Sequence, residues 1–186
     1  MLNKPRQRKC RSCKELFQPW VTTAVACSVP CAIAITRVAA AKVVSKDLKQ
    51  RRQAAKTLGQ LHKEAQPFFN KYIRLRDQGQ PCISCQRHHQ GQYHAGHYRS
   101  VGGSPELRYN ESNCHLQCSV CNNHLSGNAI DYRINLINKI GIKAVELLEG
   151  PNDPAKYTRE DIQGIKAKYR LMTKQLEDQP QLNHGE

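Results

Sequence analysis

Apolar side chains recur at helical spacing in the C-terminal part of the chain. One such segment covers residues 129–148, and another follows the capping-box pair Thr158 and Asp161. Gly141 is a point at which the first segment can break in two, and residues 150–154 have the composition of a loop. We predict helices on both sides of this loop, packed as an antiparallel support for the middle of the chain, with these apolar positions aligned: Ile130, Ile134, Ile137, Ile140, Ala144, Leu148, Ile162, Ile165, Tyr169, Met172 and Leu176.

A different pattern precedes the middle of the chain. Residues 38–64 lack proline and are rich in Ala, Lys, Gln and Arg, which predicts a long basic helix that Pro67 limits. The most apolar stretch, residues 32–44, is interrupted by Arg37 and Lys42 and is shorter than the roughly twenty residues of a membrane span. We therefore expect no membrane role. A second short apolar pattern leads into the middle of the chain through Phe68, Phe69, Tyr72, Ile73 and Leu75.

The net charge of +14 is unevenly distributed. Residues 1–80 carry 17 Lys and Arg against 4 Asp and Glu, whereas residues 81–186 carry 12 against 11. This asymmetry predicts a basic arm that neutralises phosphates and a near-neutral remainder for chemistry, and a merely solubilising surface is the simpler alternative. The candidate DNA contacts are Lys46, Lys49, Arg51, Arg52, Lys56 and Arg99.

Two CxxC pairs bracket the most polar part of the chain. Cys82 with Cys85 and Cys118 with Cys121 can supply four thiolates to one tetrahedral zinc, which would join the two ends of the intervening loop. Because these four ligands saturate the metal, we leave Cys114 out of the predicted site.

The N-terminal cysteines have the same character. Cys10 with Cys13 and Cys27 with Cys31 predict a small zinc knuckle, in which the metal replaces a hydrophobic core. Unrelated free or buried cysteines are the alternative. The basic, polar start lacks a secretory signal, so paired cysteines favour zinc and a reducing cytoplasm over disulfides.

Two histidines lie between the central cysteine pairs. The period of two in a strand would place His94 and Gly96 on one face and His97 on the other. A neutral imidazole accepts a proton from water near physiological pH, so His97 is the candidate general base, whereas His94 can face a metal. An ordinary surface or core histidine is the alternative for each.

Two asparagines complete the candidate site. Asn122 follows Cys121, where we expect a helix to start and to point back across a hairpin, so its amide oxygen can complete a hydrated Mg²⁺ site. Asn113 is expected to hold the loop backbone near the base, and an ordinary turn asparagine is an equal alternative.

Four motifs carry a specific resemblance: HAGHYR at 94–99, LRYNE at 107–111, NCHLQC at 113–118 and CNNHLSGN at 121–128. From about residue 68 to residue 176 the chain resembles the NinG recombination proteins of lambdoid phages, also called Rap. The N-terminal cysteine pairs are similar too, with a tighter first spacing than that family has. More distantly, the order of cysteines, His and Asn resembles zinc-stapled Holliday-junction resolvases of the endonuclease VII type, within the HNH superfamily.

The resemblance implies a structure-specific endonuclease that cuts four-way junctions and D-loops with Mg²⁺ or Mn²⁺ in the host cytoplasm. It makes His97 the general base, Asn113 the middle residue of a His-Asn-Asn set and Asn122 a metal or phosphate ligand. The family pattern has Asp at position 94, and the His94 of this chain favours softer ions such as Mn²⁺ or Zn²⁺. Paired symmetric cuts require two sites, so a homodimer is one candidate assembly. Other phage recombination proteins are further candidate partners.

We thus predict an α+β protein with a zinc-stabilised ββα-metal (HNH-like) core. Its parts are an N-terminal zinc knuckle (1–35), a basic helical connector (36–80), a nuclease domain with supporting helices (81–178) and a tail (179–186). The expected activity is metal-dependent hydrolysis of phosphodiesters in branched recombination intermediates. The main alternative is a non-catalytic zinc-dependent DNA-binding or regulatory protein, and an RNA-binding or assembly module is the third.

Overall fold

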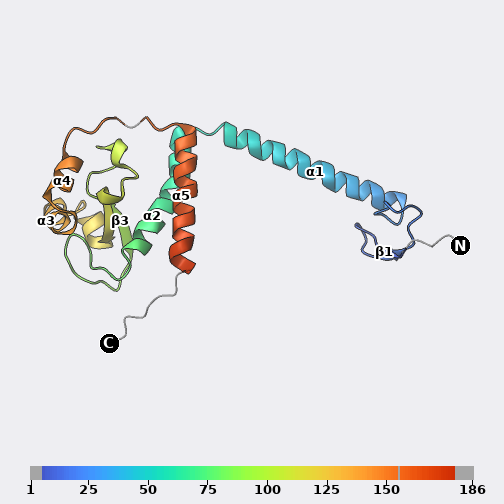
Figure 1. The fold of residues 1–186 in the computed structure, drawn as a ribbon, viewed down its shortest axis with the longest axis horizontal. Coiled ribbons are helices and arrows are strands. Elements are labelled where there is room, and N and C mark those ends of the chain that lie inside the picture. The colour runs from blue at the N-terminus through green and yellow to red at the C-terminus, as the bar shows by residue number, and fades with distance from the viewer. Residues whose placement is uncertain (1–5, 155, 179–186) are drawn as a thin grey trace. The chain divides into compact units, whose positions relative to one another are not determined.

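The computed structural model describes residues 6–154 and 156–178, so the predicted tail at 179–186 lies outside the described residues. The fold is α+β, with two small antiparallel sheets and five α-helices in the described part. The chain divides into two compact units, Met1–Lys56 and Thr57–Glu186 (Figure 1). Within the described residues, no helix is both long and apolar enough to cross a membrane.

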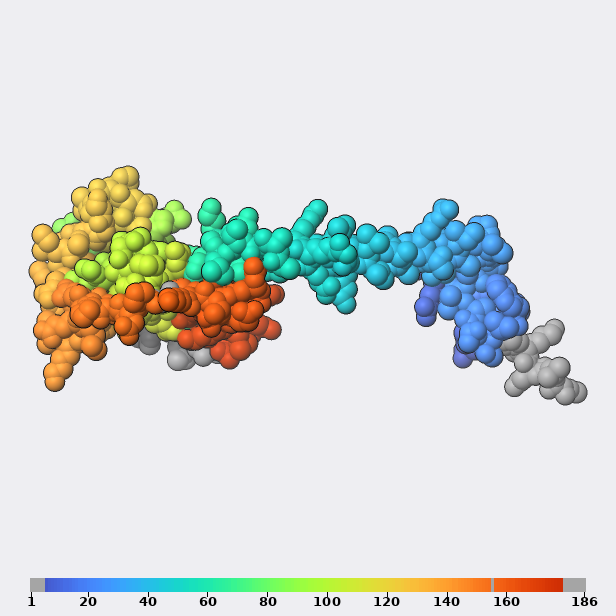
Figure 2. Space-filling view, turned by 90° about the horizontal axis from the view of Figure 1, so that it is seen from above, coloured from blue at the N-terminus to red at the C-terminus, as the bar shows by residue number. Residues whose placement is uncertain are grey.

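The first unit is a short hairpin followed by a long helix. Strands β1 (Arg8–Lys9) and β2 (Leu16–Phe17) pair antiparallel, and Arg8 lies opposite Phe17. Helix α1 (Val29–Ala54) begins after Ser28, whose side chain accepts a hydrogen bond from the backbone N–H of Cys31 at 3.5 Å. No residue of α1 is buried. Figure 2 shows its side chains, from light blue to cyan, exposed along most of the helix.

The predicted single helix over residues 38–64 is wrong. The chain instead ends α1 at Ala54 and starts α2 (Leu58–Arg76) at a capping box. In this box Gln60 N donates to Thr57 Oγ1 at 3.3 Å, and Thr57 N donates to Gln60 Oε1 at 2.9 Å. The cap satisfies N–H groups that a helix start leaves unpaired, so it sets the boundary.

Pro67 does not limit a helix either, because it lies inside α2. Proline in a helix interior removes one backbone hydrogen bond, a cost that tertiary packing must offset. Here the same helix buries one face, and its buried residues are Leu61, Ala65, Phe69, Tyr72 and Ile73.

The second unit places a hairpin between two helical layers (Figure 1). Strand β3 (Tyr93–His97) pairs antiparallel with β4 (Cys114–Cys118). One layer is α2 with α5 (Arg159–Asp178), which lie side by side. The other is α3 (Ala129–Ile140) with α4 (Ile142–Glu149). Three short 3₁₀ or π turns, Pro105–Leu107, Glu111–Asn113 and Val120–His124, connect these elements.

The C-terminal helices were predicted only in part. Gly141 does break the first segment, with a φ of 85° that favours glycine, and the Thr158–Asp161 capping box is present. The predicted buried face of α3 is wrong at two positions, because Ile130 is 79% exposed and Ile134 is 55% exposed. The two C-terminal segments also do not form one antiparallel support for the middle of the chain, since α5 packs on α2, whereas α3 and α4 belong to a separate core.

A buried carboxylate joins the end of α2 to β4. Arg76 binds Asp77 through two bonds, Nε to Oδ1 at 2.8 Å and Nη2 to Oδ2 at 2.9 Å. Asp77 Oδ2 also accepts the backbone N–H of Leu116 at 3.0 Å, and Lys139 Nζ lies 3.7 Å away. Burial would raise the pKa of Asp77, but hydrogen bonds from His115 and Arg76 hold this pKa well below its usual range. The carboxylate therefore stays charged and fixes the hairpin to α2.

Candidate functional site

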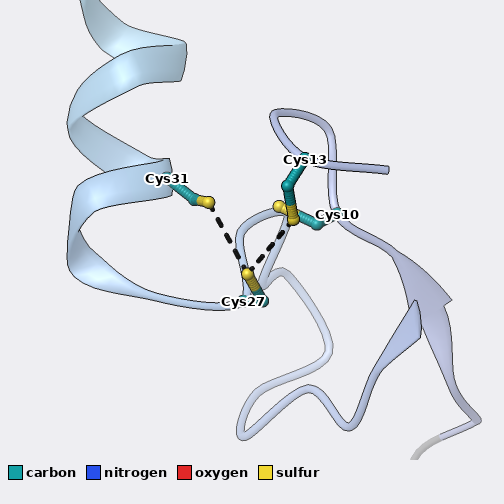
Figure 3. Close-up of side chains that lie close together, drawn as sticks. All are labelled: Cys10, Cys13, Cys27 and Cys31. Carbon is teal, nitrogen blue, oxygen red and sulfur yellow. Dashed lines mark hydrogen bonds between the residues drawn. The ribbon is translucent and has the colours of Figure 1, made fainter. Parts of the chain in front are cut away.

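The four N-terminal cysteines come together in one cluster. The sulfur atoms of Cys10, Cys13, Cys27 and Cys31 all lie within 4.8 Å of one another, and Cys27 is 3.6 Å from both Cys13 and Cys31 (Figure 3). A tetrahedral zinc with bonds of about 2.3 Å needs sulfur atoms about 3.8 Å apart. The cluster therefore fits a structural zinc, as the sequence predicted.

The central cysteines form a second cluster of the same kind. Cys82, Cys85, Cys118 and Cys121 also place their sulfur atoms within 4.8 Å of one another. Backbone N–H groups point at these sulfurs, from Cys118 to Cys82 at 3.3 Å and from Cys121 to Cys118 at 3.4 Å. Such N–H donors stabilise thiolates, so this set also fits zinc. A zinc bound by these four cysteines would join the turn at residues 82–85 to the end of β4.

The register of the hairpin separates the two predicted histidines. His94 pairs with Gln117 and His97 pairs with Cys114, so their side chains occupy opposite faces, as predicted. Gly96 is required between them, because an added Cβ would lie 2.1 Å from Gln117 Oε1. The absence of a side chain at Gly96 leaves room for the buried Gln117 side chain to pack against β3. Gln117 Nε2 donates to Gly127 O at 2.6 Å.

His97 is held from both sides of its ring. Its Nε2 lies 2.9 Å from the carbonyl oxygen of Arg108, so Nε2 carries the proton and Nδ1 carries the lone pair. Nδ1 lies 3.7 Å from the Cys114 sulfur, and the Phe69 ring is 5.9 Å from the imidazole, centroid to centroid. Burial lowers the pKa of His97, which keeps the imidazole neutral at physiological pH.

The side-chain amide of Asn113 is bonded to the loop backbone. Its side chain is fully buried and bridges the loop after β3: Arg99 N donates to Oδ1 at 2.8 Å, and Nδ2 donates to Arg99 O at 3.0 Å. Nδ2 also bonds Leu107 O at 3.2 Å. These bonds fix the loop that supplies the carbonyl of Arg108, so Asn113 positions His97 through the backbone.

Asn122, predicted to lie near His94, is not arranged as expected. Asn122 does not open a helix but lies in the π turn Val120–His124, and α3 starts later at Ala129. The π turn brings Asn123 rather than Asn122 next to His94, with Nδ2 and Nε2 3.5 Å apart. Asn122 donates to Asn123 Oδ1 at 2.7 Å. Sequence reasoning missed Asn123, because only the wider turn decides which amide faces the strand.

A partly exposed ion pair contacts Tyr98, the residue after His97. Arg133 binds Glu149 through Nε at 2.6 Å and Nη2 at 2.9 Å, and the Tyr98 hydroxyl donates to the same carboxylate. These bonds join β3 to α3 and α4. The arrangement carried no sequence signal, since Arg133 and Glu149 stand in separate helices.

The predicted DNA contacts fall into two groups. Arg99 is exposed beside the loop that Asn113 holds. The other five belong to the first unit, where Arg51 is paired with Asp47 at 2.9 Å and Lys56 bonds Gln53 at 2.6 Å. Lys46 and Lys49 line a shallow exposed surface of α1 together with Lys42.

Comparison of the sequence with known proteins shows the family of this chain. The profile described as "Bacteriophage Lambda NinG protein" matches residues 2–179. Protein ninG of Escherichia phage lambda is 37% identical over 196 residues, which cover 95% of this chain and 96% of that protein. Protein ninG of Escherichia phage 933W is 38% identical, over 93% and 95%, and that of Salmonella phage P22 is 37% identical, over 94% and 96%. No solved structure matches the chain. The chain therefore belongs to the NinG family of bacteriophage proteins.

Proposed function

We propose that this protein is a structure-specific DNA endonuclease that hydrolyses phosphodiesters in branched recombination intermediates, such as Holliday junctions and D-loops. In this proposal the hairpin, the central cysteine cluster and the turn after it form an HNH-like ββα-metal core. The observation that carries the proposal is the fixed tautomer of His97. A hydrogen bond from Nε2 to the Arg108 carbonyl leaves Nδ1 as the only proton acceptor of the ring.

His97 would act as the general base. Its lowered pKa keeps Nδ1 unprotonated at neutral pH, so the ring can take a proton from the water that attacks phosphorus. Asn113 is a positioning residue, because it holds the loop that carries the Arg108 carbonyl. The central zinc would hold the hairpin and take no part in chemistry.

The second face of the hairpin offers polar groups for a divalent cation. His94, Asn122 and Asn123 are joined by hydrogen bonds in one row. Neutral amide oxygens suit hydrated Mg²⁺, whereas an imidazole nitrogen suits Mn²⁺ better. A cation bound here would stabilise negative charge on the phosphoryl and leaving oxygens. We include Asn123 beside the predicted His94 and Asn122 because it makes the contact with His94.

The basic first unit would supply the affinity for DNA. Recognition of a branch rather than a sequence needs contacts to the phosphate backbone and a deformable substrate. Residues 1–56 carry 13 Lys and Arg against 2 Asp and Glu, whereas residues 57–186 carry 16 against 13.

One observation favours a second candidate, a zinc-dependent DNA-binding protein without catalysis. The Nδ1 atom of His97 lies 3.7 Å from the sulfur of the buried Cys114. A purely structural histidine would have the same surroundings. Binding of junction DNA without cleavage is what this candidate predicts.

The deciding experiment is incubation of four-way junction DNA with the purified full chain and Mg²⁺ or Mn²⁺, read on a denaturing gel. We expect cuts near the branch, and we expect His97→Ala to slow cleavage by about 10²- to 10⁴-fold with unchanged zinc content and junction affinity. His88→Ala is the matched control, since His88 is an exposed histidine in the segment before β3. Junction binding without cleavage by any divalent cation would falsify the endonuclease.

The cation site is tested in the same assay. Asn122→Ala and Asn123→Ala should each reduce cleavage, with partial recovery when the cation concentration is raised. His94→Asp should keep activity and shift the preference towards Mg²⁺, because a carboxylate is a harder ligand than imidazole. If all three variants cleave like the wild type with the same cation preference, the cation binds elsewhere.

A further inference from the structure

An exposed aromatic side chain lies on the N-terminal cysteine module, which comprises the described residues 6–31 and holds all four cysteines of the cluster. Trp20 is 67% exposed, although tryptophan is usually among the more buried residues. The nuclease site described above lies in the other unit and makes no use of it.

The exposure of Trp20 is fixed by its neighbours. Pro19, the residue before it, is fully buried, and Arg8 Nη1 donates to Thr22 O at 2.6 Å, which ties β1 to the same loop. The Phe17 ring braces the indole, with centroids 6.5 Å apart and an interplanar angle of 56°. The indole is thus held outward by an anchored loop.

Basic side chains surround this aromatic surface. Arg8 lies opposite Phe17 in the hairpin, so both side chains share one face of the small sheet. All charged residues of the module are exposed. Five are basic and one, Glu15, is acidic; the basic residues are Arg6, Arg8, Lys9, Arg11 and Lys14. An outward indole in a strongly positive setting complements a polyanion that has free aromatic faces.

We propose that the N-terminal cysteine module binds single-stranded DNA, with Trp20 stacking on an unpaired base and the basic side chains neutralising the adjacent phosphates. Base stacking needs no particular sequence, which suits the open strands at a branch point. Duplex DNA keeps its base faces stacked within the helix, so it cannot use the indole in this way. The choice of branched DNA as the natural target rests on the proposed function above, but the binding itself does not.

The chain offers a direct probe, because Trp20 is its only tryptophan. Fluorescence of the full zinc-loaded chain, excited selectively at the indole, reports on this site alone. We expect an oligo(dT) strand to quench this fluorescence in a saturable way, without added divalent cation, while a duplex of equal length quenches much less. Trp20→Ala should weaken oligo(dT) binding by about 5- to 100-fold, the range for loss of one stacked base. This loss is measured by fluorescence anisotropy of labelled DNA.

Two matched variants separate stacking from general damage. Trp20→Phe should retain most of the affinity, because it keeps an aromatic face. Val21→Ala, a change at the exposed neighbouring residue, should leave it unchanged. Zinc content must stay the same in all variants. Oligo(dT) that binds without quenching, or a Trp20→Ala variant with wild-type affinity, overturns the inference. Failure of the chain to cut junctions would refute the proposed endonuclease and leave this binding result intact.

Discussion

The two cysteine clusters have the same ligand set but different surroundings. Around the N-terminal cluster, no large apolar side chain of the described residues 6–56 is buried; the small apolar residues buried there include Ala24 and Ala26. The central cluster lies within the second unit, which has two apolar cores, one around Phe69 and one around Leu136. A metal in the first unit would therefore take the place of a hydrophobic core. A metal in the second unit would add a local cross-link to a unit that already has a hydrophobic core.

Removal of metal should show the largest effect of this difference. Structural zinc contributes roughly 10–16 kcal/mol in small zinc modules, so a chelator should unfold residues 6–28 completely. We expect the α2–α5 pair to remain protected, because its apolar contacts are independent of either cluster. Hydrogen exchange read by peptide mass spectrometry measures both regions in one sample.

Single variants sharpen this test. Wild-type protein should contain two zinc ions per chain, and Cys27→Ser and Cys118→Ser should each lose one. Only Cys118→Ser should disturb the β3–β4 hairpin and, with it, the proposed nuclease activity. A wild-type zinc content near one would refute metal binding at the N-terminal cluster.

The buried carboxylate of the second unit gives the next largest effect. Asp77→Ala should lower the free energy of unfolding of this unit by about 3–5 kcal/mol, because it leaves Arg76 and the Leu116 N–H without their buried partner. Asp47→Ala is the control, since Asp47 is paired on the exposed surface of α1 and should change stability by less than about 1 kcal/mol. Urea unfolding measures both.

The same carboxylate predicts a pH dependence with a definite sign. Because the folded pKa of Asp77 lies below its ordinary value of 3.8, its stabilisation is present above that pH and is lost as the pH falls below it. Wild-type protein should therefore lose stability more steeply below pH 3.8 than Asp77→Ala does. Equal slopes for the two proteins would show that the ion pair contributes nothing.

Features that depend on local sequence could be predicted, whereas contacts between distant segments could not. Cysteine spacing identified both clusters, and strand alternation placed His94 and His97 on opposite faces, because both depend only on local geometry. The break between α1 and α2 was missed although Thr57 and Gln60 encode it, since a helix-rich composition hides a short capping signal. The contacts of Asp77 with Leu116, of Arg133 with Glu149 and of Asn123 with His94 join segments far apart in the sequence, so no local pattern could reveal them.

Charge provides a smaller contrast between the units. A chain that starts at Lys56 keeps the Thr57 cap of α2 and loses twelve of the basic residues counted in 1–56. If about six of them contact phosphates, the slope of log K against log salt should become less negative by about 5. Replacement of Lys42, Lys46 and Lys49 with Gln should make it less negative by about 3. DNA binding measured at several salt concentrations tests both, and an unchanged slope would mean that this unit is only a solubilising extension.

The smallest predicted effect lies at His97, the proposed general base. Burial raises the pKa of the Cys114 thiol, so it stays protonated and can donate to His97 Nδ1, 3.7 Å away. A donor at this atom favours the neutral imidazole, so Cys114→Val, which removes the donor and roughly keeps the volume, should raise the pKa of His97 a little, while burial still holds this pKa below its ordinary value. NMR titration of the His97 ring measures this shift without any need for cleavage. In the nuclease assay the acid limb of the pH–rate profile should move to higher pH by the same amount, and the rate at neutral pH should change by less than about tenfold. A His97 pKa that does not move would mean that Cys114 only fills space and leaves Nδ1 free to meet water.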